Sequence, residues 1–162
     1  MKFFTPQTIF LSTTLAALSA LLLAVSLSWP TPSRAEKAGP EFEDNFETAR
    51  EAAEEAGKPL IVIFSASWCA PCQQMKSSVY PSEEVQPYHE SFVWAYLDAD
   101  KEENRPLMAQ FGVSGIPHIT FFRADGSAIG QFAGAVDPLQ FTKILTKVLD
   151  AADNPSDSDA KG

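Results

Sequence analysis

The sequence predicts an α/β domain with a central mixed sheet of four strands and helices on both faces. Two short apolar segments, residues 60–64 and 92–97, are each followed by a segment with helical spacing, as in strand–helix units. Two further strand-like segments, residues 118–123 and 128–132, are joined by an Asp-Gly turn, which is typical of an antiparallel hairpin. Amphipathic helices are predicted before and after this series. The pattern places one domain at residues 42–150.

The first 35 residues have the layout of an export signal. An uncharged segment rich in Leu and Ala, residues 9–29, is followed by Ser33 and Ala35, whose small side chains fit a cleavage site. We expect cleavage before Glu36. The alternative is an uncleaved anchor, because the apolar segment is long enough to span a bilayer. In both cases the folded part is expected in the periplasm or an equivalent space outside the cytoplasm.

The first helix of the domain is expected after a short linker, residues 36–41. The order Asp44-Asn45-Phe46-Glu47 is interpreted as a capping box, with the Asp44 carboxylate as the acceptor and Glu47 three residues later. Gly57 is expected to end the helix because glycine accepts the left-handed conformation of a C-terminal cap. The apolar face of this helix consists of Phe46, Ala49, Ala53 and Ala56.

Residues 60–64 are apolar without alternation, which predicts a strand covered on both faces. Cys69 and Cys72 follow this strand. Pro71 between them is tolerated in a first helical turn, where its missing N–H removes no hydrogen bond. The two cysteines are therefore expected to open the second helix.

The chain then repeats the order of strand and helix. Residues 80–82 break the second helix, and a short helix is expected at residues 82–84, before Pro87. The strand at residues 92–97 leads through a polar segment into a helix that Gly112 closes. The apolar face of that helix consists of Leu107, Met108 and Phe111.

A hairpin and a last helix complete the domain. Asp125 and Gly126 form the predicted turn, and Asp137 is the expected cap of a helix with Pro138 in its first position. One face of the helix carries Phe141, Ile144, Leu145 and Val148. Residues 151–162 are rich in Ala, Asp, Ser and Pro, which predicts a disordered acidic tail.

Charge and cysteine content restrict the functional classes. The 162 residues carry 21 acidic and 12 basic side chains without a cluster of Lys or Arg, which argues against nucleic acid or an anionic membrane surface as partner. A disulfide between the two cysteines would close a very short loop, for which chain entropy gives only about 2 kcal/mol. A purely structural bridge is therefore disfavoured, although an exported chain is expected to oxidise the pair.

A redox role follows from where the cysteines stand. A thiol in the first turn of a helix meets unpaired N–H groups, which favour the thiolate, so Cys69 is expected to be the nucleophile. Cys72, one turn later, is expected to attack a mixed disulfide on Cys69 and release the partner in reduced form.

Metal sites with the same cysteine spacing are the alternatives. Zinc needs two further Cys or His ligands, and the histidines of the chain are His89 and His118. Covalent haem needs a histidine directly after Cys72, where Gln73 stands. A Cu(I)-binding metallochaperone stays an alternative function because two thiolates suit Cu(I), with Met75 as a further sulfur. The favoured interpretation has no metal and no bound cofactor.

The segment Trp68-Cys69-Ala70-Pro71-Cys72 after an apolar strand, with Gly115-Ile116-Pro117 before another, resembles the thioredoxin superfamily over residues 42–149. Residues 57–75 and 81–85 are similar to the exported thioredoxin-like group that includes the C-terminal domain of DsbD. The resemblance implies a thioredoxin-like fold and a thiol-disulfide oxidoreductase. Its redox-active group would be the Cys69–Cys72 disulfide.

The resemblance also implies roles for individual residues. Cys69 would be the attacking thiol, Cys72 the resolving thiol and Pro117 a cis proline packed against the disulfide. The backbone of Ile116 would bind an extended substrate. The implied substrate groove comprises Trp68, Ile116, Pro117, Gly134 and Ala135.

Two positions depart from the family. Ile63 stands where thioredoxin and the DsbD domain carry a buried acid that assists proton transfer from the resolving thiol, and Tyr96 stands where thioredoxin has a lysine. Deprotonation of Cys72 would then depend on water, on the leaving group of the substrate or on another side chain. His118 is the candidate for such proton transfer.

The absence of a histidine between the cysteines and the match of Ile116 to thioredoxin favour a reductase over the alternative, a disulfide-donating oxidase. An isomerase of this superfamily generally has a dimerisation domain, for which the chain leaves no length, so an isomerase is not expected. We expect a monomer. The expected partners are disulfide-bonded exported proteins and a separate membrane or soluble thiol that donates electrons.

Overall fold

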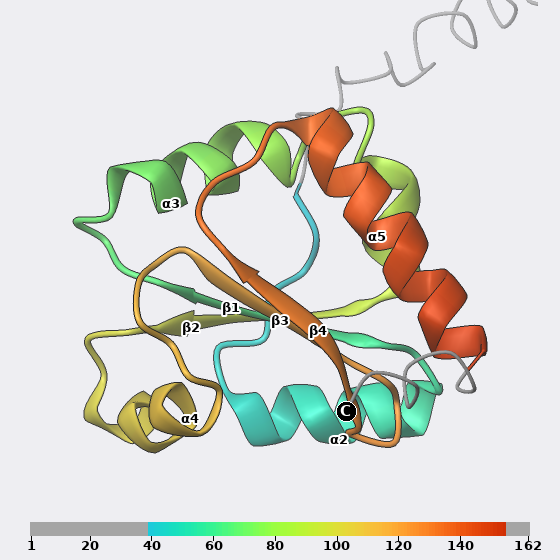
Figure 1. Cartoon of the computed structure of the whole chain (residues 1–162), viewed down its shortest axis with the longest axis horizontal. Helices are drawn as coiled ribbons and strands as arrows, with labels where there is room; N and C mark the ends of the chain where they lie inside the picture. Colours follow the sequence, from blue (N-terminus) through green and yellow to red (C-terminus); the bar gives the residue numbers. More distant parts are fainter. Residues whose placement is uncertain (1–38, 155–162) are drawn as a thin grey trace, which may run out of the picture. The chain divides into compact units, whose positions relative to one another are not determined.

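The computed structural model describes residues 39–154, in which the four predicted strands form one sheet in the order β2-β1-β3-β4 (Figure 1). The strands are β1 (Leu60–Ser65), β2 (Val93–Asp98), β3 (His118–Phe122) and β4 (Ala128–Ala133). The expected signal or anchor at residues 1–35 lies outside the described residues, as does the tail from residue 155 onward. Within the described range, none of the helices has the length and apolar content needed to span a bilayer.

The sheet is mixed, as predicted. Strand β1 pairs in parallel with β2 and antiparallel with β3, and β3 pairs antiparallel with β4. The register places Ser65 opposite Asp98 at the ends of β1 and β2, so the segments after both strands leave the sheet at the same edge. In the β3–β4 turn, Gly126 has a φ of +82° and the Asp125 carboxylate accepts the N–H of Ser127 at 2.9 Å.

Helices cover both faces of the sheet. One face carries α2 (Phe46–Ala56) and α4 (Arg105–Gln110) (Figure 1). The other face carries α3 (Ala70–Gln74), the π-helical segment η1 (Met75–Val79) that continues it, and α5 (Pro138–Asp153). All six residues of β1 are buried between these two layers, as the run of apolar residues predicts for a central strand.

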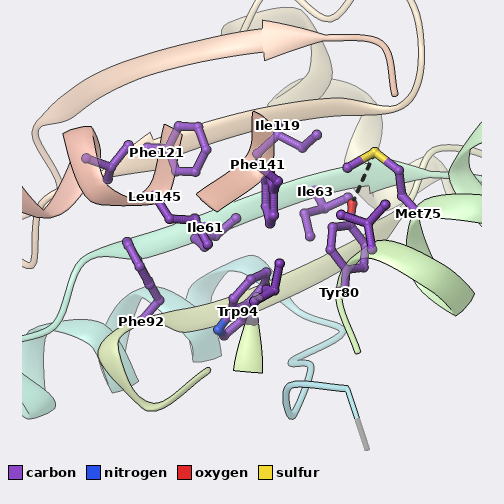
Figure 2. Packing of buried hydrophobic residues seen from close by; sticks show 13 residues of the cluster. Ile61, Ile63, Met75, Tyr80, Phe92, Trp94, Ile119, Phe121, Phe141 and Leu145 are labelled. Atoms are coloured by element: carbon purple, nitrogen blue, oxygen red, sulfur yellow. Dashed lines mark hydrogen bonds between the residues drawn. The ribbon is translucent and has the colours of Figure 1, made fainter. Parts of the chain in front are cut away.

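An aromatic cluster holds the layer of α3 and α5 on the sheet (Figure 2). The rings of Tyr80, Trp94 and Phe141 are buried, with centroids 5.6 to 6.1 Å apart. The indole N–H of Trp94 donates to the carbonyl oxygen of His89 at 3.1 Å, and Nε2 of His89 lies 2.8 Å from the carbonyl oxygen of Tyr80. Burial raises the pKa of Tyr80, so its hydroxyl stays protonated and donates to Sδ of Met75 at 3.9 Å.

The chain before α2 covers the outer edge of β2. The N–H of Glu43 donates to the carbonyl oxygen of Trp94, and the N–H of Tyr96 donates to the carbonyl oxygen of Glu43, both at 2.8 Å. The ring of Phe42 packs against those of Tyr80, Trp94 and Tyr96, with centroids 5.2 to 6.2 Å apart. Phe42 is thus a component of the core.

The cap of α2 differs from the sequence interpretation. Asn45, rather than Asp44, is the N-terminal cap, and its Oδ1 accepts the N–H of Thr48 at 3.1 Å. Because the helix begins at Phe46, Asp44 lies one residue before the capping position, and its side chain is exposed. The C-terminal end agrees with the prediction, since Gly57 has a φ of +63°.

Two further boundaries need correction. Residues 82–84 form a turn, and the short helix is instead the 3₁₀ helix η2 (Gln86–Ser91), which has Pro87 in its first turn, where a missing N–H costs nothing. A second 3₁₀ helix, η3 (Glu102–Asn104), precedes α4. Helix α5 begins after the predicted Asp137 cap and continues to Asp153. Residues 151–153, which were expected in the disordered tail, are therefore helical.

Replacement of Asn45 by Ala is expected to lower the free energy of unfolding by about 1 kcal/mol, because the N–H of Thr48 then loses its acceptor. Asp44→Ala is the matched control, with an expected change below about 0.5 kcal/mol. Urea unfolding followed by tryptophan fluorescence measures both variants. An equal or larger loss for Asp44→Ala would contradict the assignment of Asn45 as the cap.

Candidate active site

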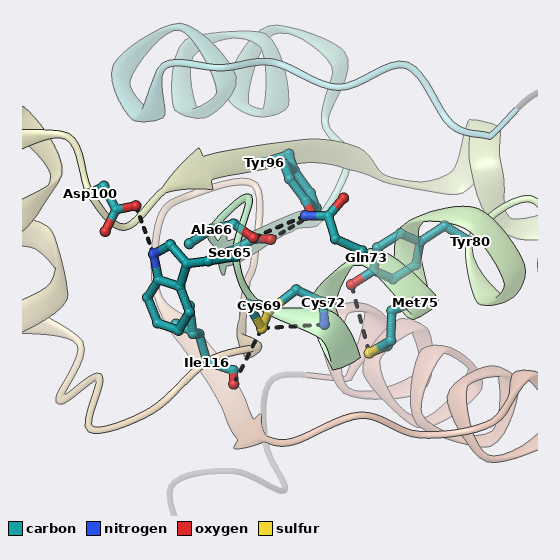
Figure 3. Close-up of a disulfide and its surroundings, with 11 residues drawn as sticks. Ser65, Ala66, Cys69, Cys72, Gln73, Met75, Tyr80, Tyr96, Asp100 and Ile116 are labelled. Carbon is teal, nitrogen blue, oxygen red and sulfur yellow. Dashed lines mark hydrogen bonds between the residues drawn. A yellow bond between two sulfur atoms is a disulfide. The ribbon is translucent and has the colours of Figure 1, made fainter.

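Cys69 and Cys72 form a disulfide at the start of α3, directly after β1 and its connecting loop (Figure 3). Their Cα atoms are 5.3 Å apart. Both residues are buried, with 4% of Cys69 and 1% of Cys72 exposed. The difference between the two exposed fractions is small, and the role of Cys69 as the attacking thiol stays a prediction.

The first turn of α3 directs a donor at the sulfur of Cys69. The backbone N–H of Cys72 points at Sγ of Cys69 at 3.3 Å. The carbonyl oxygen of Ala66 accepts both the N–H of Cys69 at 3.2 Å and the side-chain amide of Gln73 at 2.9 Å. These bonds hold the loop against the helix. In the reduced state an N–H donor at Sγ stabilises the thiolate over the thiol.

Two other segments approach the disulfide. The peptide bond between Ile116 and Pro117 is cis, and the carbonyl oxygen of Ile116 lies 3.8 Å from Sγ of Cys69 (Figure 3). The N–H of Gly134 donates to the carbonyl oxygen of Pro117 at 2.8 Å. Gly134 has a φ of +100°, a conformation that favours glycine. The structure thus places Ile116 beside the sulfur pair and joins Pro117 to the segment that contains Gly134 and Ala135.

Trp68 is 69% exposed, yet its indole N–H is fixed by Oδ2 of Asp100 at 2.9 Å (Figure 3). The residues after β2 are expected only as a polar segment, and Asp100 is not among the predicted site residues. Trp68 follows β1 and Asp100 follows β2, and the ends of neighbouring parallel strands meet at one edge. This rule is the signal in the sequence from which the proximity of Trp68 and Asp100 could be predicted.

The site lacks an acid on β1 and has hydroxyl groups nearby. Ile63 is wholly buried among apolar side chains. The hydroxyls of Tyr96 and Ser65 lie 2.5 Å apart, and the ammonium group of Lys76 lies 4.3 Å from the Tyr96 ring centroid. Burial raises the pKa of Tyr96, which keeps the phenol neutral. These groups, with Gln73, line a hollow of about 280 Å³ beside the first turn of α3.

His118, the candidate for proton transfer, is buried at the start of β3. Its ring contacts Phe64, with centroids 6.4 Å apart, and Nε2 lies 3.4 Å from Oε1 of Gln131. Phe64 faces the layer of α2 and α4, so the His118 ring lies on the face of the sheet opposite α3. Its Nδ1 is buried without a hydrogen-bond partner among the described residues. The proton-transfer role stays a prediction.

The described residues bear on the metal alternatives in two ways. Residues 39–154 contain no cluster of three or more Cys, His, Asp or Glu side chains arranged to hold a metal ion. Met75, the further sulfur considered for Cu(I), is wholly buried in the core, where its Sδ accepts the hydroxyl of Tyr80. Its side chain thus fills the core between η1 and the sheet.

Comparison with known proteins identifies the family. A family model described as a thioredoxin-like domain matches residues 46–149. The chloroplastic thioredoxin-like protein HCF164 of Arabidopsis thaliana is 34% identical over 85 residues, which cover 52% of this chain and 31% of that protein. The chain thus spans less than a third of that relative.

Solved structures agree with this result. The C-terminal domain of DsbD from Neisseria meningitidis, in its reduced form, is 26% identical, with a TM-score of 0.55 over 62% of this chain and 91% of that one. A thioredoxin from Thermus thermophilus has the same fold, with a TM-score of 0.67 at 22% identity over 77% of this chain and 98% of that one. The buried strand, the cysteine pair at the helix start and these matches together establish that the chain belongs to the thioredoxin-like family.

Proposed function

We propose that this protein is an exported thiol-disulfide oxidoreductase that reduces protein disulfides through Cys69 and Cys72. The observation that carries the proposal is the N–H of Cys72 directed at Sγ of Cys69 at 3.3 Å, within a disulfide that closes the first turn of α3. A donor in this position stabilises negative charge on the sulfur that attacks. Membership of a family whose relatives include thiol:disulfide interchange proteins supports the same chemistry.

The first step consumes the client disulfide. The thiolate of Cys69 attacks one client sulfur, a bond forms between the two, and the client S–S bond breaks. The other client sulfur leaves as a thiolate and takes up a proton. The carbonyl of Ile116, 3.8 Å from Sγ of Cys69, lies where an extended client backbone would pass the attacking sulfur.

The second step releases the client. Cys72 loses its proton and attacks Sγ of Cys69, the Cys69–Cys72 bond forms, and the mixed disulfide breaks. The second client sulfur leaves and is protonated, so two electrons and two protons have reached the client. A separate membrane or soluble thiol donor then returns two electrons to the disulfide, and no bound cofactor takes part.

The proton of Cys72 has several acceptors in this proposal. Ile63 has no carboxylate that could accept this proton. The client thiolate that leaves in the first step is a base near the site and can accept it. Water in the hollow beside Tyr96 and Ser65 is a second acceptor. The His118 ring lies on the other face of the sheet, so the proton of Cys72 could reach it only through intervening water molecules.

The remaining expectations form part of the same proposal. Residues 1–35 direct export and are removed or act as an anchor, which places the domain in the periplasm or an equivalent compartment. Residues 42–150 act as a monomer on disulfide-bonded exported proteins. A disulfide-donating oxidase would use the same residues in the reverse direction, so the reduction potential decides between the two.

Cys72→Ser is expected to accumulate a mixed disulfide between Cys69 and the client, because nothing then resolves it. Cys69→Ser is the matched control and is expected to form no adduct and to lose all exchange. Insulin reduction, with non-reducing electrophoresis of the trapped species, measures both effects. Full turnover by Cys72→Ser would show that the resolving role is wrongly assigned.

The reduction potential of the Cys69–Cys72 pair is expected near the thioredoxin value of about −270 mV if the protein is a reductase. Equilibration with a thiol-disulfide buffer of higher reducing power than glutathione, followed by thiol trapping, measures it. A value near about −120 mV would reverse the direction and make the protein a disulfide donor.

Asp100→Ala is expected to raise the KM for protein disulfides by about threefold, because the exposed Trp68 indole loses the bond that orients it toward a client. Asp100→Asn is the matched control, since its amide oxygen still accepts the indole N–H while the charge is lost. Steady-state kinetics with insulin distinguish the two variants. Equal effects of both would assign the role to the charge of Asp100 instead of the hydrogen bond.

A further inference from the structure

The hollow beside the first turn of α3, about 280 Å³ in volume, adjoins the cysteine pair. Ala66 lines this hollow and also packs in one cluster with the two cysteines. Gln73, the residue after Cys72, lines it as well. Figure 3 shows Ser65, Gln73 and Tyr96 together beside the disulfide. The small side chain of Ala66 therefore connects the hollow with the surroundings of the resolving cysteine.

Cys72 must lose a proton in the second step of the proposed reaction, and its surroundings oppose this loss. The residue is 1% exposed, and removal from water favours the neutral thiol over the thiolate. Strand β1 offers the apolar Ile63 on the face that α3 covers. A positive charge near the thiol would offset the effect of burial, because it attracts the thiolate and leaves the thiol unaffected.

Lys76 brings a positive charge to the hollow. It lines the hollow one helical turn after Cys72, and side chains four residues apart are neighbours on a helix surface. Cys72 and Tyr80, four residues before and after Lys76, are both buried. Lys76 itself is exposed, so it stands at the margin of the helix face that packs on the sheet. This margin is the side of the helix that carries the resolving thiol.

Aromatic rings hold the ammonium group of Lys76 without neutralising its charge. The group lies 4.3 Å from the centroid of the Tyr96 ring and 5.8 Å from that of the Phe42 ring, within the range of cation–π contacts. Within residues 39–154 no carboxylate forms an ion pair with it. The two rings therefore position a full positive charge beside the hollow.

Two other titratable groups face the hollow among the described residues of its lining, and both come from β2. Burial raises the pKa of Tyr96, so the phenol stays neutral and its hydroxyl pairs with that of Ser65. Asp98 carries the opposing charge, and its Oδ1 accepts the N–H of Asp100 at 2.9 Å. The segment before β3 contributes the uncharged Ile116 to the cysteine cluster. Lys76 is thus the charge of the lining that favours a thiolate.

We propose that the Lys76 ammonium, positioned by the Tyr96 ring, promotes loss of the Cys72 proton when the mixed disulfide is resolved. The proposal rests on the exchange reaction proposed above and adds two positioning residues to it. Lys76 acts on Cys72 through its charge, and Tyr96 acts by holding Lys76. The proton itself goes to the client thiolate or to water in the hollow, so no bond to Lys76 forms or breaks.

The test titrates the Cys72 thiol in the full chain with Cys69→Ser, where Cys72 is the one thiol left. This background imitates the mixed disulfide, in which Cys69 has no charge. Lys76→Gln is expected to raise the pKa of Cys72, because the thiolate loses a favourable charge, and Lys76→Arg is expected to restore it. Carbon-13 NMR of the Cys72 Cβ atom follows the titration. An unchanged titration in Lys76→Gln would overturn the proposal.

Lys147→Gln is the matched control for the loss of charge. Lys147 lies on α5 and lines a different hollow, between α5 and β4. The variant removes the same net charge from the chain and is expected to leave the titration of Cys72 unchanged. A shift equal to that of Lys76→Gln would assign the effect to the net charge of the chain and overturn the role of Lys76.

Variants of Tyr96 separate the ring from the hydroxyl. Tyr96→Phe keeps the ring beneath the ammonium and is expected to leave the titration of Cys72 unchanged. Tyr96→Leu removes the ring and is expected to raise the pKa of Cys72, as Lys76→Gln does. An effect of Tyr96→Phe as large as that of Tyr96→Leu would assign the role to the hydroxyl and overturn the positioning role of the ring.

Two further measurements identify the effect as one of charge. Asp98→Asn removes the opposing charge of the same hollow and is expected to lower the pKa of Cys72. The Debye length falls to about 3 Å at about 1 M salt, so the difference between wild type and Lys76→Gln is expected to shrink there. A difference that is independent of salt would overturn the electrostatic explanation.

The effect on rate is measured with both cysteines present. Lys76→Gln is expected to slow release of the reduced client in a single turnover by about twofold at neutral pH. The loss is smaller than the loss of thiolate, because a less acidic thiol is the stronger nucleophile. At a pH where Cys72 is fully ionised in both proteins the difference is expected to disappear. A difference that persists there would indicate a structural role for Lys76 instead.

Failure of the proposed function can be told apart from failure of this inference, because the thiol titration needs no client. If Lys76→Gln shifts the titration but the wild-type chain exchanges no disulfide with insulin, the redox proposal fails and the charge effect stands. If exchange proceeds but the titration of Cys72 is the same with and without Lys76, the charge effect fails and the redox proposal stands.

Discussion

The position of the cysteine pair depends on the burial of β1. Six consecutive residues without an exposed face are stable only between two neighbouring strands and beneath helices on both sides. Strands β2 and β3 supply the neighbours, and the two helix layers supply the cover. A shift by one residue would exchange Ile63 and Phe64 between layers of different shape. The end of β1 is therefore fixed, and with it the place where the loop to Cys69 begins.

The site itself is assembled from segments that meet at one edge of the sheet. The loop after β1 carries Trp68 and the cysteines, and the chain after β2 brings Asp100 to the indole. The segment before β3 brings Ile116 to Sγ of Cys69, and the chain after β4 is bonded to Pro117 through Gly134. Short polar contacts between these segments hold the residues of the predicted groove close to one another, which no single element could do. The arrangement brings residues that are distant in sequence to one disulfide.

Features with a local cause could be predicted from the sequence. The Asp125–Gly126 turn, the left-handed Gly57 and the Asp137 cap each depend on residues within one turn, and the structure contains all three. The cap of α2 is Asn45 instead of Asp44, and because Asp and Asn are both good capping residues the local sequence does not choose between these neighbours. The Trp68–Asp100 bond and the sheet face of His118 depend on strand pairing, which the sequence pattern alone does not specify.

The bonds of Glu43 to β2 have a consequence for behaviour in solution. An outer strand with free N–H and C=O groups is a template on which another chain can add a strand, the route to amyloid-like aggregation. Here Glu43 occupies the carbonyl of Trp94 and the N–H of Tyr96, and it adds a carboxylate at that edge. An unfolded neighbour thus finds these two groups at the middle of the β2 edge already bonded, which disfavours the addition of a strand at that position.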